Sequence, residues 1–267
     1  MKVSVLNLVP LRHGESFKDA MDAMVRLAKR VEDLGYTRYW IAEHHNMRSI
    51  ASSATQLLIQ HTLANTKKIR VGSGGVMLPN HSPYLIAEQY GTLETLYPNR
   101  VDLGLGRAPG TDVPTAMALR RTKDLKTDFE RDLAELSGYF KGSNYVQAYP
   151  AHGLYLPFYI LGSSTDSAYL AAKLGLPYSF AAHFAPAMME NAIAIYNRYF
   201  QPSAILDKPY VILGVNAILA DTDEEAKRLS TTMIQSFLNI VTSNQKGLMP
   251  PLQSEEAVWR EFIATNK

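Results

Sequence analysis

Short apolar runs alternate with longer amphipathic stretches along most of this chain. Residues 3–9 are apolar and rich in β-branched side chains, which is typical of a strand. From Phe17 to Leu34, apolar residues recur at helical spacing. Ser16 and Asp19 predict a capping box at the start of this helix, and Gly35 suits its end. The chain is therefore predicted to begin with a strand followed by a helix.

The same alternation continues toward the end of the chain. Six further strands are predicted at residues 36–42, 69–73, 101–105, 157–161, 178–182 and 210–219. Helices are predicted at residues 53–64, from Ser82 and Pro83 onward, at 128–139, 166–174 and 186–200, and from a cap at 221–224 toward Val241. Residues 255–263 form one more amphipathic turn or two, and no eighth strand is predicted.

Strands that alternate with helices predict an α/β protein with a parallel sheet covered by helices. The 267 residues permit a (β/α)₈ barrel (TIM barrel), which needs roughly 250 residues. A doubly wound sheet has the same periodicity, so the pattern leaves both architectures open. If the fold is a barrel, its last strand and helix are missing from this chain.

Composition excludes several classes of protein. The 27 Lys and Arg residues against 25 Asp and Glu leave a formal charge of +2, which argues against a broad basic surface for nucleic acid or membrane. The chain has no cysteine, so disulfides, thiolate metal sites and cysteine nucleophiles are excluded. Because no apolar run of roughly 18–20 residues and no signal peptide is found, we expect a soluble, cytoplasmic protein.

Glu43, His44 and His45 follow the second predicted strand. Parallel α/β folds place their active sites at the carboxyl ends of the strands, so these side chains are candidates for catalysis. An ordinary polar strand end, with the two histidines pointing in opposite directions, is an equally good interpretation. A metal site is less favoured, because neither His-x-His nor His-Glu-x-x-His occurs.

Glycines lie at the ends of the third and fourth predicted strands. Residues 72–75 would let a flat ligand approach the backbone, although a simple bulge explains them as well. The glycine spacing in residues 104–110 misses the dinucleotide-binding fingerprint by one residue. Arg107 offers a cation beside this segment.

Residues 161–167 connect the fifth predicted strand directly to a helix. Free backbone N–H groups, the positive end of the helix dipole and several hydroxyls together predict a phosphate site there. A serine-rich helix cap is the alternative interpretation. Asp166 favours that alternative, because its carboxylate would repel an anion unless it points away.

Taken together, these loops resemble those of the bacterial luciferase-like flavin monooxygenases. The resemblance rests on AEHH at residues 42–45, LPNHSP at 78–83, YPNRVDLGLGR at 97–107, YILGSS at 159–164 and LGLP at 174–177. It implies one TIM-barrel domain over residues 1–267, C-terminally truncated or incomplete. It also implies an FMN-dependent monooxygenase, with reduced flavin supplied by a separate reductase. Such an enzyme uses O₂ to oxygenate a small, apolar organic substrate.

The resemblance also assigns roles to residues near the flavin ring. Gly74 and Gly75 match a backbone strip against the isoalloxazine ring, where that family often has a non-prolyl cis peptide bond. His44 matches a catalytic base or proton donor, and its ordinary pKa of about 6.5 suits proton transfer at neutral pH. Glu43 would orient His44 or line the pocket.

The flavin phosphate is assigned a second group of residues. Arg107 matches an arginine at the phosphate, and Arg131 is a candidate for a second one. Ser163 and Ser164 match the phosphate loop, with Ser167 one turn further as a hydroxyl donor.

Other functions stay open at this point. Gly106 stands where luciferases have a reactive cysteine, so light emission is not implied. A flavin-binding protein without turnover and an oxidoreductase that uses the deazaflavin F420 are the alternatives on the same barrel. A metal-dependent barrel hydrolase is the third alternative. The resemblance also suggests a homodimer through residues 53–64 and 86–96, although burial of these helices within one subunit explains their apolar faces equally well.

Overall fold

A single parallel sheet organises the molecule. The computed structural model describes residues 1–108, 111–120, 126, 128–242, 244 and 246–265, so residues 109–110 of the glycine-rich segment lie outside the described part. The strands are β1 (Ser4–Asn7), β2 (Arg38–Ile41), β3 (Arg70–Met77), β4 (Val101–Gly106), β5 (Phe158–Gly162), β6 (Tyr178–Phe180) and β7 (Val211–Leu213). All adjacent pairs are parallel, and strand order follows chain order.

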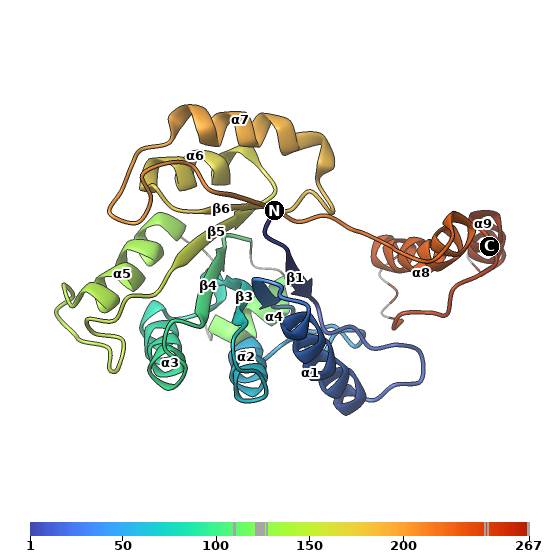
Figure 1. Ribbon diagram of the computed structural model, residues 1–267, viewed down its shortest axis with the longest axis horizontal. Helices are drawn as coiled ribbons and strands as arrows, with labels where there is room; N and C mark the ends of the chain where they lie inside the picture. Colours follow the sequence, from blue (N-terminus) through green and yellow to red (C-terminus); the bar gives the residue numbers. More distant parts are fainter. Residues whose placement is uncertain (109–110, 121–125, 127, 243, 245, 266–267) are drawn as a thin grey trace.

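This sequential order decides between the two predicted architectures. A doubly wound sheet reverses its strand order at a switch point, whereas here the order runs from β1 to β7 without reversal. Figure 1 shows the sheet curling, with the helices on its outer side. In the described residues no ladder joins β7 to β1 and no eighth strand occurs. The fold is therefore of the TIM-barrel type, in the form of a curled half-barrel.

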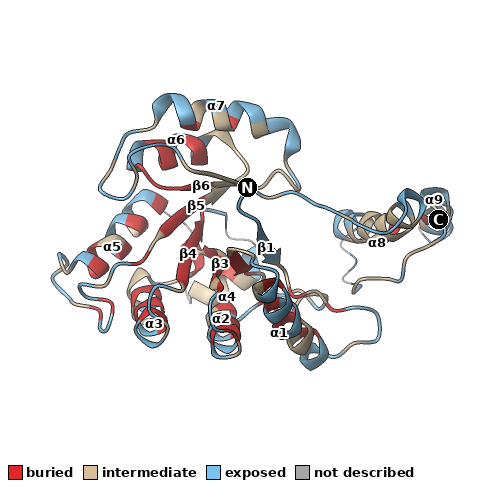
Figure 2. Cartoon of the chain, viewed as in Figure 1, coloured by how far each residue is buried: buried red, intermediate tan, exposed pale blue. Residues whose placement is uncertain are grey.

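Helices connect successive strands and cover the outer face of the sheet. They are α1 (Phe17–Asp33), α2 (Thr55–Ala64), α3 (Pro83–Leu96), α5 (Phe129–Lys141), α6 (Thr165–Leu174) and α7 (Met189–Tyr199). Figure 2 shows that the strands and the sheet-facing sides of these helices are buried. The core lies in this layer and contains Tyr39, Ile41, Leu103 and Leu105. No described helix combines the length and apolarity that crossing a bilayer requires.

Three helices lie outside this repeat. α4 (Val113–Arg120) follows β4 and was not predicted. α8 (Asp223–Val241) and α9 (Glu255–Thr265) pack on each other and lie apart from the sheet, beyond an extended segment (Figure 1). The turn between them touches the loop after β1, because Leu248 exchanges backbone hydrogen bonds with Leu11 and His13. This contact ties the outlying pair of helices to the half-barrel.

The predicted seventh strand is too long. Residues 210–219 were expected to be extended, but only Val211–Leu213 join the sheet. The reason is the partner, since β6 has three residues and offers pairing for no more. The Gly214 N–H still donates to the Phe180 carbonyl, and the chain then leaves the sheet.

The capping box at the start of α1 is confirmed. The Asp19 N–H donates to Ser16 Oγ at 3.2 Å, and the Ser16 N–H donates to the Asp19 carboxylate at 2.9 Å. Hydrogen bonds from Ser16 lower the pKa of Asp19. The local sequence was sufficient here because both partners lie within one turn.

We expect Ser16→Ala to lower the free energy of unfolding by about 1 kcal/mol, because it leaves the first N–H groups of α1 without their side-chain acceptor. Urea unfolding followed by far-ultraviolet circular dichroism measures this change. Lys18→Ala, on the same helix but with its side chain in solvent, is the matched control and should stay within about 0.5 kcal/mol of wild type. Equal effects of both substitutions would contradict the assignment of the cap.

A buried polar network lies on the inner face of the sheet. Asp102 is fully buried and accepts bonds from Arg38 Nε at 3.1 Å and Trp40 Nε1 at 3.0 Å. Arg70 donates to its other oxygen from Nε and Nη2, at 2.8 and 2.6 Å. The Tyr159 hydroxyl accepts from Arg38 Nη2 at 3.2 Å. These residues lie near the amino ends of their strands, which leaves the carboxyl ends for a site.

Candidate active site

Most of the predicted site residues lie along one rim of the half-barrel. Glu43 and His44 follow β2, Gly74 and Gly75 lie in β3, Arg107 follows β4, and Ser163 and Ser164 follow β5. These four strands are parallel neighbours, so their carboxyl ends form a continuous edge. Ser167 and Arg131 lie in the first turns of α6 and α5. The structure therefore places loops that are far apart in the sequence at the same end of the sheet, where the strands have their carboxyl ends.

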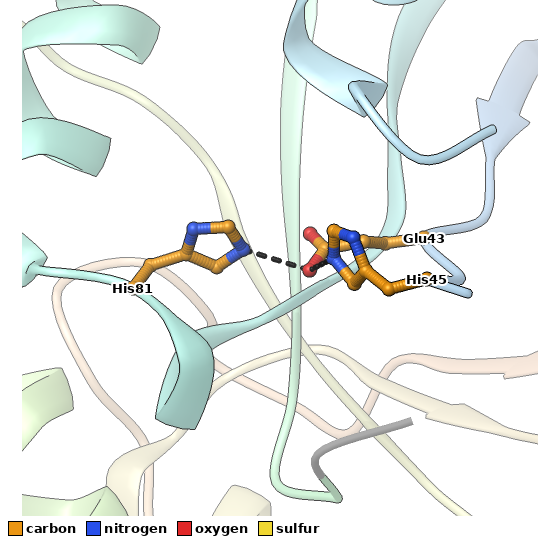
Figure 3. A group of neighbouring side chains, drawn as sticks. All are labelled: Glu43, His45 and His81. Atoms are coloured by element: carbon orange, nitrogen blue, oxygen red, sulfur yellow. Dashed lines mark hydrogen bonds and ion pairs between the residues drawn. The ribbon is translucent and has the colours of Figure 1, made fainter. Parts of the chain in front are cut away.

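Glu43 is the buried centre of a hydrogen-bonded cluster. Its side chain is 1% exposed, and its Oε1 lies 2.9 Å from His45 Nε2 and 2.7 Å from His81 Nε2 (Figure 3). The Met77 N–H points at Oε2 from 3.4 Å. Burial by itself raises the pKa of Glu43, but the hydrogen bonds from the two imidazoles outweigh it, and the pKa lies below its ordinary value. Glu43 is therefore ionised at neutral pH and cannot act as a general acid.

His44 is not one of the residues that hydrogen-bond Glu43 in this cluster. Its Nδ1 atom is buried and has no hydrogen-bond partner among the described residues, while its backbone N–H donates to the Ser52 carbonyl at 3.2 Å. Burial lowers the pKa of His44 below its ordinary value, against the opposing effect of the Glu43 charge. The imidazole is therefore neutral at pH 7 and can accept a proton.

Gly74 and Gly75 form a strip of backbone that excludes side chains. The peptide bond between them is cis, as the resemblance implies, and the pairing of β3 with β4 shifts register here. A Cβ on Gly74 would lie 2.6 Å from Leu6 Cδ1, and a Cβ on Gly75 would lie 2.8 Å from the Gly104 carbonyl oxygen. A side chain at position 75 would therefore collide with backbone, whereas one at position 74 would require the Leu6 side chain to move. The sequence allowed either a bulge or a stretch of backbone open to a flat ligand. The register shift confirms the bulge, and the same residues leave the backbone without side chains.

The loop from β5 into α6 has the features of an anion site. Ser164 is the N-cap of α6 in extended conformation, yet its side chain accepts no capping hydrogen bond. The first N–H groups of α6 therefore have no side-chain acceptor, and the helix dipole adds positive potential. Ser167 is buried and donates to the Ser164 carbonyl at 2.8 Å, so its hydroxyl already holds the loop. Gly162 is required, since a Cβ there would lie 1.9 Å from Ser167 Oγ.

The two candidate phosphate arginines differ in their surroundings. Arg107 Nη2 lies 3.2 Å from Asp166, and the two side chains are 50% and 68% exposed. Asp166 therefore does not point away from the loop, and a phosphate has to compete with it for Arg107. Arg131 is largely in solvent and lies 3.6 Å from Asp132.

A cavity of about 590 Å³ opens between the carboxyl ends of β4 and β5 and helices α5 and α6. Arg107, Asp166 and Ser167 line it, whereas Gly74 and His44 do not. Lys173 also lines it and pairs with Glu130 at 2.9 Å. Ser163 and Ser164 do not line it either, so the cavity includes only some of the residues assigned to the phosphate.

The roles of two residues of the site were not predicted. His45 is a candidate only as part of the polar strand end, and His81 belongs to the family-like segment 78–83, but the resemblance assigns neither of them a role. The one signal for them was their presence in the same family-like segments as Glu43. Their convergence on Glu43 depends on a contact between loops 38 residues apart for His81, which no local pattern encodes.

Comparison with known proteins gives a consistent result. A family model described as "Luciferase-like monooxygenase" matches residues 1–266. The protein YvbT of Bacillus subtilis (strain 168), described as uncharacterized, is 53% identical over 268 residues, which cover 97% of this chain and 79% of the relative. A "Luciferase-like monooxygenase" of Escherichia coli (strain K12) is 49% identical over 260 residues, covering 96% of this chain and 78% of the relative.

Solved structures share the fold. The crystal structure of apo-MsnO8 superposes with a TM-score of 0.90 at 34% identity, covering 98% of this chain and 78% of that one. The oxygenating constituent of 3,6-diketocamphane monooxygenase from Pseudomonas putida, in complex with FMN, has a TM-score of 0.70 at 19% identity and covers 92% and 78%. An F420-dependent secondary alcohol dehydrogenase has a TM-score of 0.63 at 14% identity and covers 98% and 81%. These last two show the fold alone.

Proposed function

This chain belongs to the luciferase-like monooxygenase family, and from that membership we propose that it is an FMN-dependent monooxygenase acting on a small, apolar organic substrate. The observation that carries the proposal is the rim after β2–β5. It combines a neutral buried imidazole, a side-chain-free backbone strip and an uncapped helix N-terminus. Members of this family are oxidoreductases, and FMN and F420 both occur in proteins of this fold.

The rim fits the two ends of FMN. The N–H groups at the start of α6, with Ser163, Ser164 and Arg107, would hold the phosphate. Arg131, in the first turn of α5, and Ser167, in the first turn of α6, would add contacts to the phosphate. Arg131 would first have to leave Asp132, and Ser167 the Ser164 carbonyl. Gly74 and Gly75 would lie against the ring, because glycine has no side chain to keep a flat ligand away from the backbone. Reduced flavin, when bound, supplies the electrons that activate O₂.

His44 would accept the proton that is transferred during the reaction. Its unpartnered Nδ1 is the atom able to accept one, because burial keeps the ring uncharged at neutral pH. Glu43 acts through the backbone, since its bonds to His45 and His81 fix the segment that carries His44. Leu6 and Trp40, which lie beside Gly74, give this part of the inner face its apolar character.

We also propose that a separate reductase supplies the reduced flavin and that the protein forms a homodimer. The structure changes the surface expected for pairing. The residues of α3 that were candidates for the dimer face, Ile86, Ala87, Tyr90 and Leu93, are buried within one subunit. Leu57 on α2 and Leu85 and Leu96 on α3 remain exposed and would carry the contact.

Anaerobic titration with reduced FMN and reduced F420, followed by O₂ and a panel of apolar substrates, tests the function. The panel includes aldehydes and S-alkylcysteine derivatives, because a relative 38% identical over 189 residues is an N-acetyl-S-alkylcysteine monooxygenase. We expect tight binding of reduced FMN and an oxygenated product. Use of F420 instead would contradict the cofactor assignment, and FMN binding without any product would support a non-catalytic flavin-binding protein.

Replacing Asp166 with asparagine is expected to tighten FMN binding about two- to five-fold. The substitution removes a negative charge from the start of α6 and releases Arg107 from its exposed ion pair. Fluorescence titration with FMN measures the change, and riboflavin, which lacks the phosphate, should bind unchanged. Asp22→Asn, which removes an exposed acid on α1, is the control. Weaker FMN binding by Asp166→Asn would show that the phosphate does not meet this loop.

A further inference from the structure

Two loops meet at a cluster of three potential metal ligands. Glu43 and His45 come from the segment after β2, and His81 comes from the segment between β3 and α3. One ligand atom from each residue lies within 4.8 Å of the others. Figure 3 shows the His81 ring reaching the carboxylate from the side opposite the Glu43 backbone. His44, the immediate neighbour of both, takes no part.

The three donor atoms suit a divalent ion that is intermediate between hard and soft, such as Zn²⁺. Two imidazole nitrogens and one carboxylate oxygen are the ligands of many three-residue zinc sites, in which the fourth position stays open. The Met77 N–H at the second carboxylate oxygen is a donor and cannot ligate. A fourth ligand would therefore come from solvent.

The charge of the cluster also favours a bound cation. The Glu43 side chain is almost fully buried, and its ion-pair partners in the described part of the chain are the two histidines, with no Lys or Arg among them. A buried carboxylate without a Lys or Arg partner is a favourable position for a bound cation, because burial of an uncompensated charge is costly. A divalent ion would supply that compensation.

We propose that Glu43, His45 and His81 form a binding site for one divalent ion such as Zn²⁺. The ion would join the segment after β2 to the segment after β3. This places it in the loops that follow β2 and β3, next to His44 in the chain. The proposal does not rest on flavin binding, and a metal-dependent hydrolase is not implied.

Only small movements are needed to accept the ion. The present distances of 2.9 and 2.7 Å are those of hydrogen bonds, whereas ligand atoms around tetrahedral zinc lie roughly 3.3 Å apart. Each imidazole would ligate the ion through an unprotonated Nε2 and carry its proton on Nδ1. Neither of these Nδ1 atoms is buried without a partner in the described structure, in contrast to that of His44. This tautomer therefore leaves no buried donor unpaired.

Metal binding to the flavin-free, full chain tests the proposal. After treatment with a chelator and its removal, Zn²⁺ alone is titrated by calorimetry, and Co²⁺ alone is followed by its visible d–d absorption. We expect one ion per chain, a Co²⁺ spectrum typical of four- or five-coordination, and a higher Tm in the presence of Zn²⁺.

His81→Gln separates a metal ligand from a hydrogen-bond partner. The glutamine amide can still donate to Glu43 but is a poor zinc ligand. We expect it to lower Zn²⁺ affinity by more than the roughly 10–100-fold that loss of an outer partner costs, with Tm of the metal-free protein close to wild type. His61→Ala, an exposed histidine on α2, should leave the affinity unchanged.

Two results would overturn the proposal. One is a folded wild-type protein that binds neither ion. The other is equal Zn²⁺ affinity in wild type and His81→Gln, which would place the ion at surface histidines and leave Glu43, His45 and His81 as a hydrogen-bonded cluster. Because no flavin is present, neither result bears on the proposed oxygenase activity.

Discussion

Replacing His44 with alanine is expected to lower kcat for oxygenation by about 10²–10⁴-fold, the usual contribution of a positioned acid–base group. Reduced FMN should bind with nearly unchanged affinity, because His44 is assigned to proton transfer and the phosphate contacts lie on α6. Steady-state kinetics with an established substrate and a separate flavin titration measure the two quantities. His152→Ala, which removes a ring stacked on Tyr149 away from the rim, is the control.

The pH dependence of the wild-type enzyme checks the same assignment. His44 accepts a proton only when its ring is uncharged, and burial lowers its pKa below the ordinary value of about 6.5. The rate should therefore be constant above pH 6.5 and fall as the pH drops through the lowered pKa. This acidic limb should be absent in His44→Ala. An unchanged kcat, or an acidic limb that survives the substitution, would exclude His44 as the base.

Replacing Asp102 with alanine is expected to lower the free energy of unfolding by about 3–5 kcal/mol. The substitution leaves the Arg38 and Arg70 guanidinium groups without the carboxylate they share inside the half-barrel, and it removes the acceptor of the Trp40 N–H. Urea unfolding measures the change. If the alanine variant does not fold, Asp102→Asn keeps one acceptor oxygen and allows the same measurement with a smaller loss.

An exposed ion pair provides the matched comparison for Asp102. Glu130 pairs with Lys173 at a similar distance, but both side chains are more than half exposed. Glu130→Ala should therefore cost less than about 1 kcal/mol. Similar losses for Asp102→Ala and Glu130→Ala would show that the inner polar network does not stabilise the fold.

Local signals in the sequence predicted local structure well. The Ser16–Asp19 box begins α1 and the left-handed Gly35 follows its end, as expected, because all partners lie within one turn. Alternation alone did not predict the order of the strands, since it states which segments are strands and not which ones pair, whereas the resemblance implied the sequential order of a TIM barrel. The length of β7 was wrong for the same reason, because the short partner β6 limits it.

In the candidate site, too, local features were predictable from the sequence and contacts between distant segments were not. Glu43, Arg107 and Ser164 follow β2, β4 and β5 as predicted, whereas Gly74 lies inside β3, which continues to Met77 beyond the predicted end at residue 73. The roles of all four residues remain proposals. The alternation rule predicted that His44 and His45 point apart. It could not predict the His81 contact with Glu43 or the ion pair of Arg107 with Asp166, because both join segments distant in the chain.

The central claim is that the rim after β2–β5 binds FMN and that the start of α6 holds its phosphate. Anaerobic titration of wild type and Arg107→Ala with reduced FMN and reduced riboflavin tests it most directly. We expect wild type to bind FMN at least about ten-fold more tightly than riboflavin, since charge-assisted hydrogen bonds to phosphate contribute about 1.5–3 kcal/mol. Arg107→Ala should remove most of that difference and leave riboflavin binding unchanged. Equal affinity of the wild-type protein for FMN and riboflavin would contradict the account.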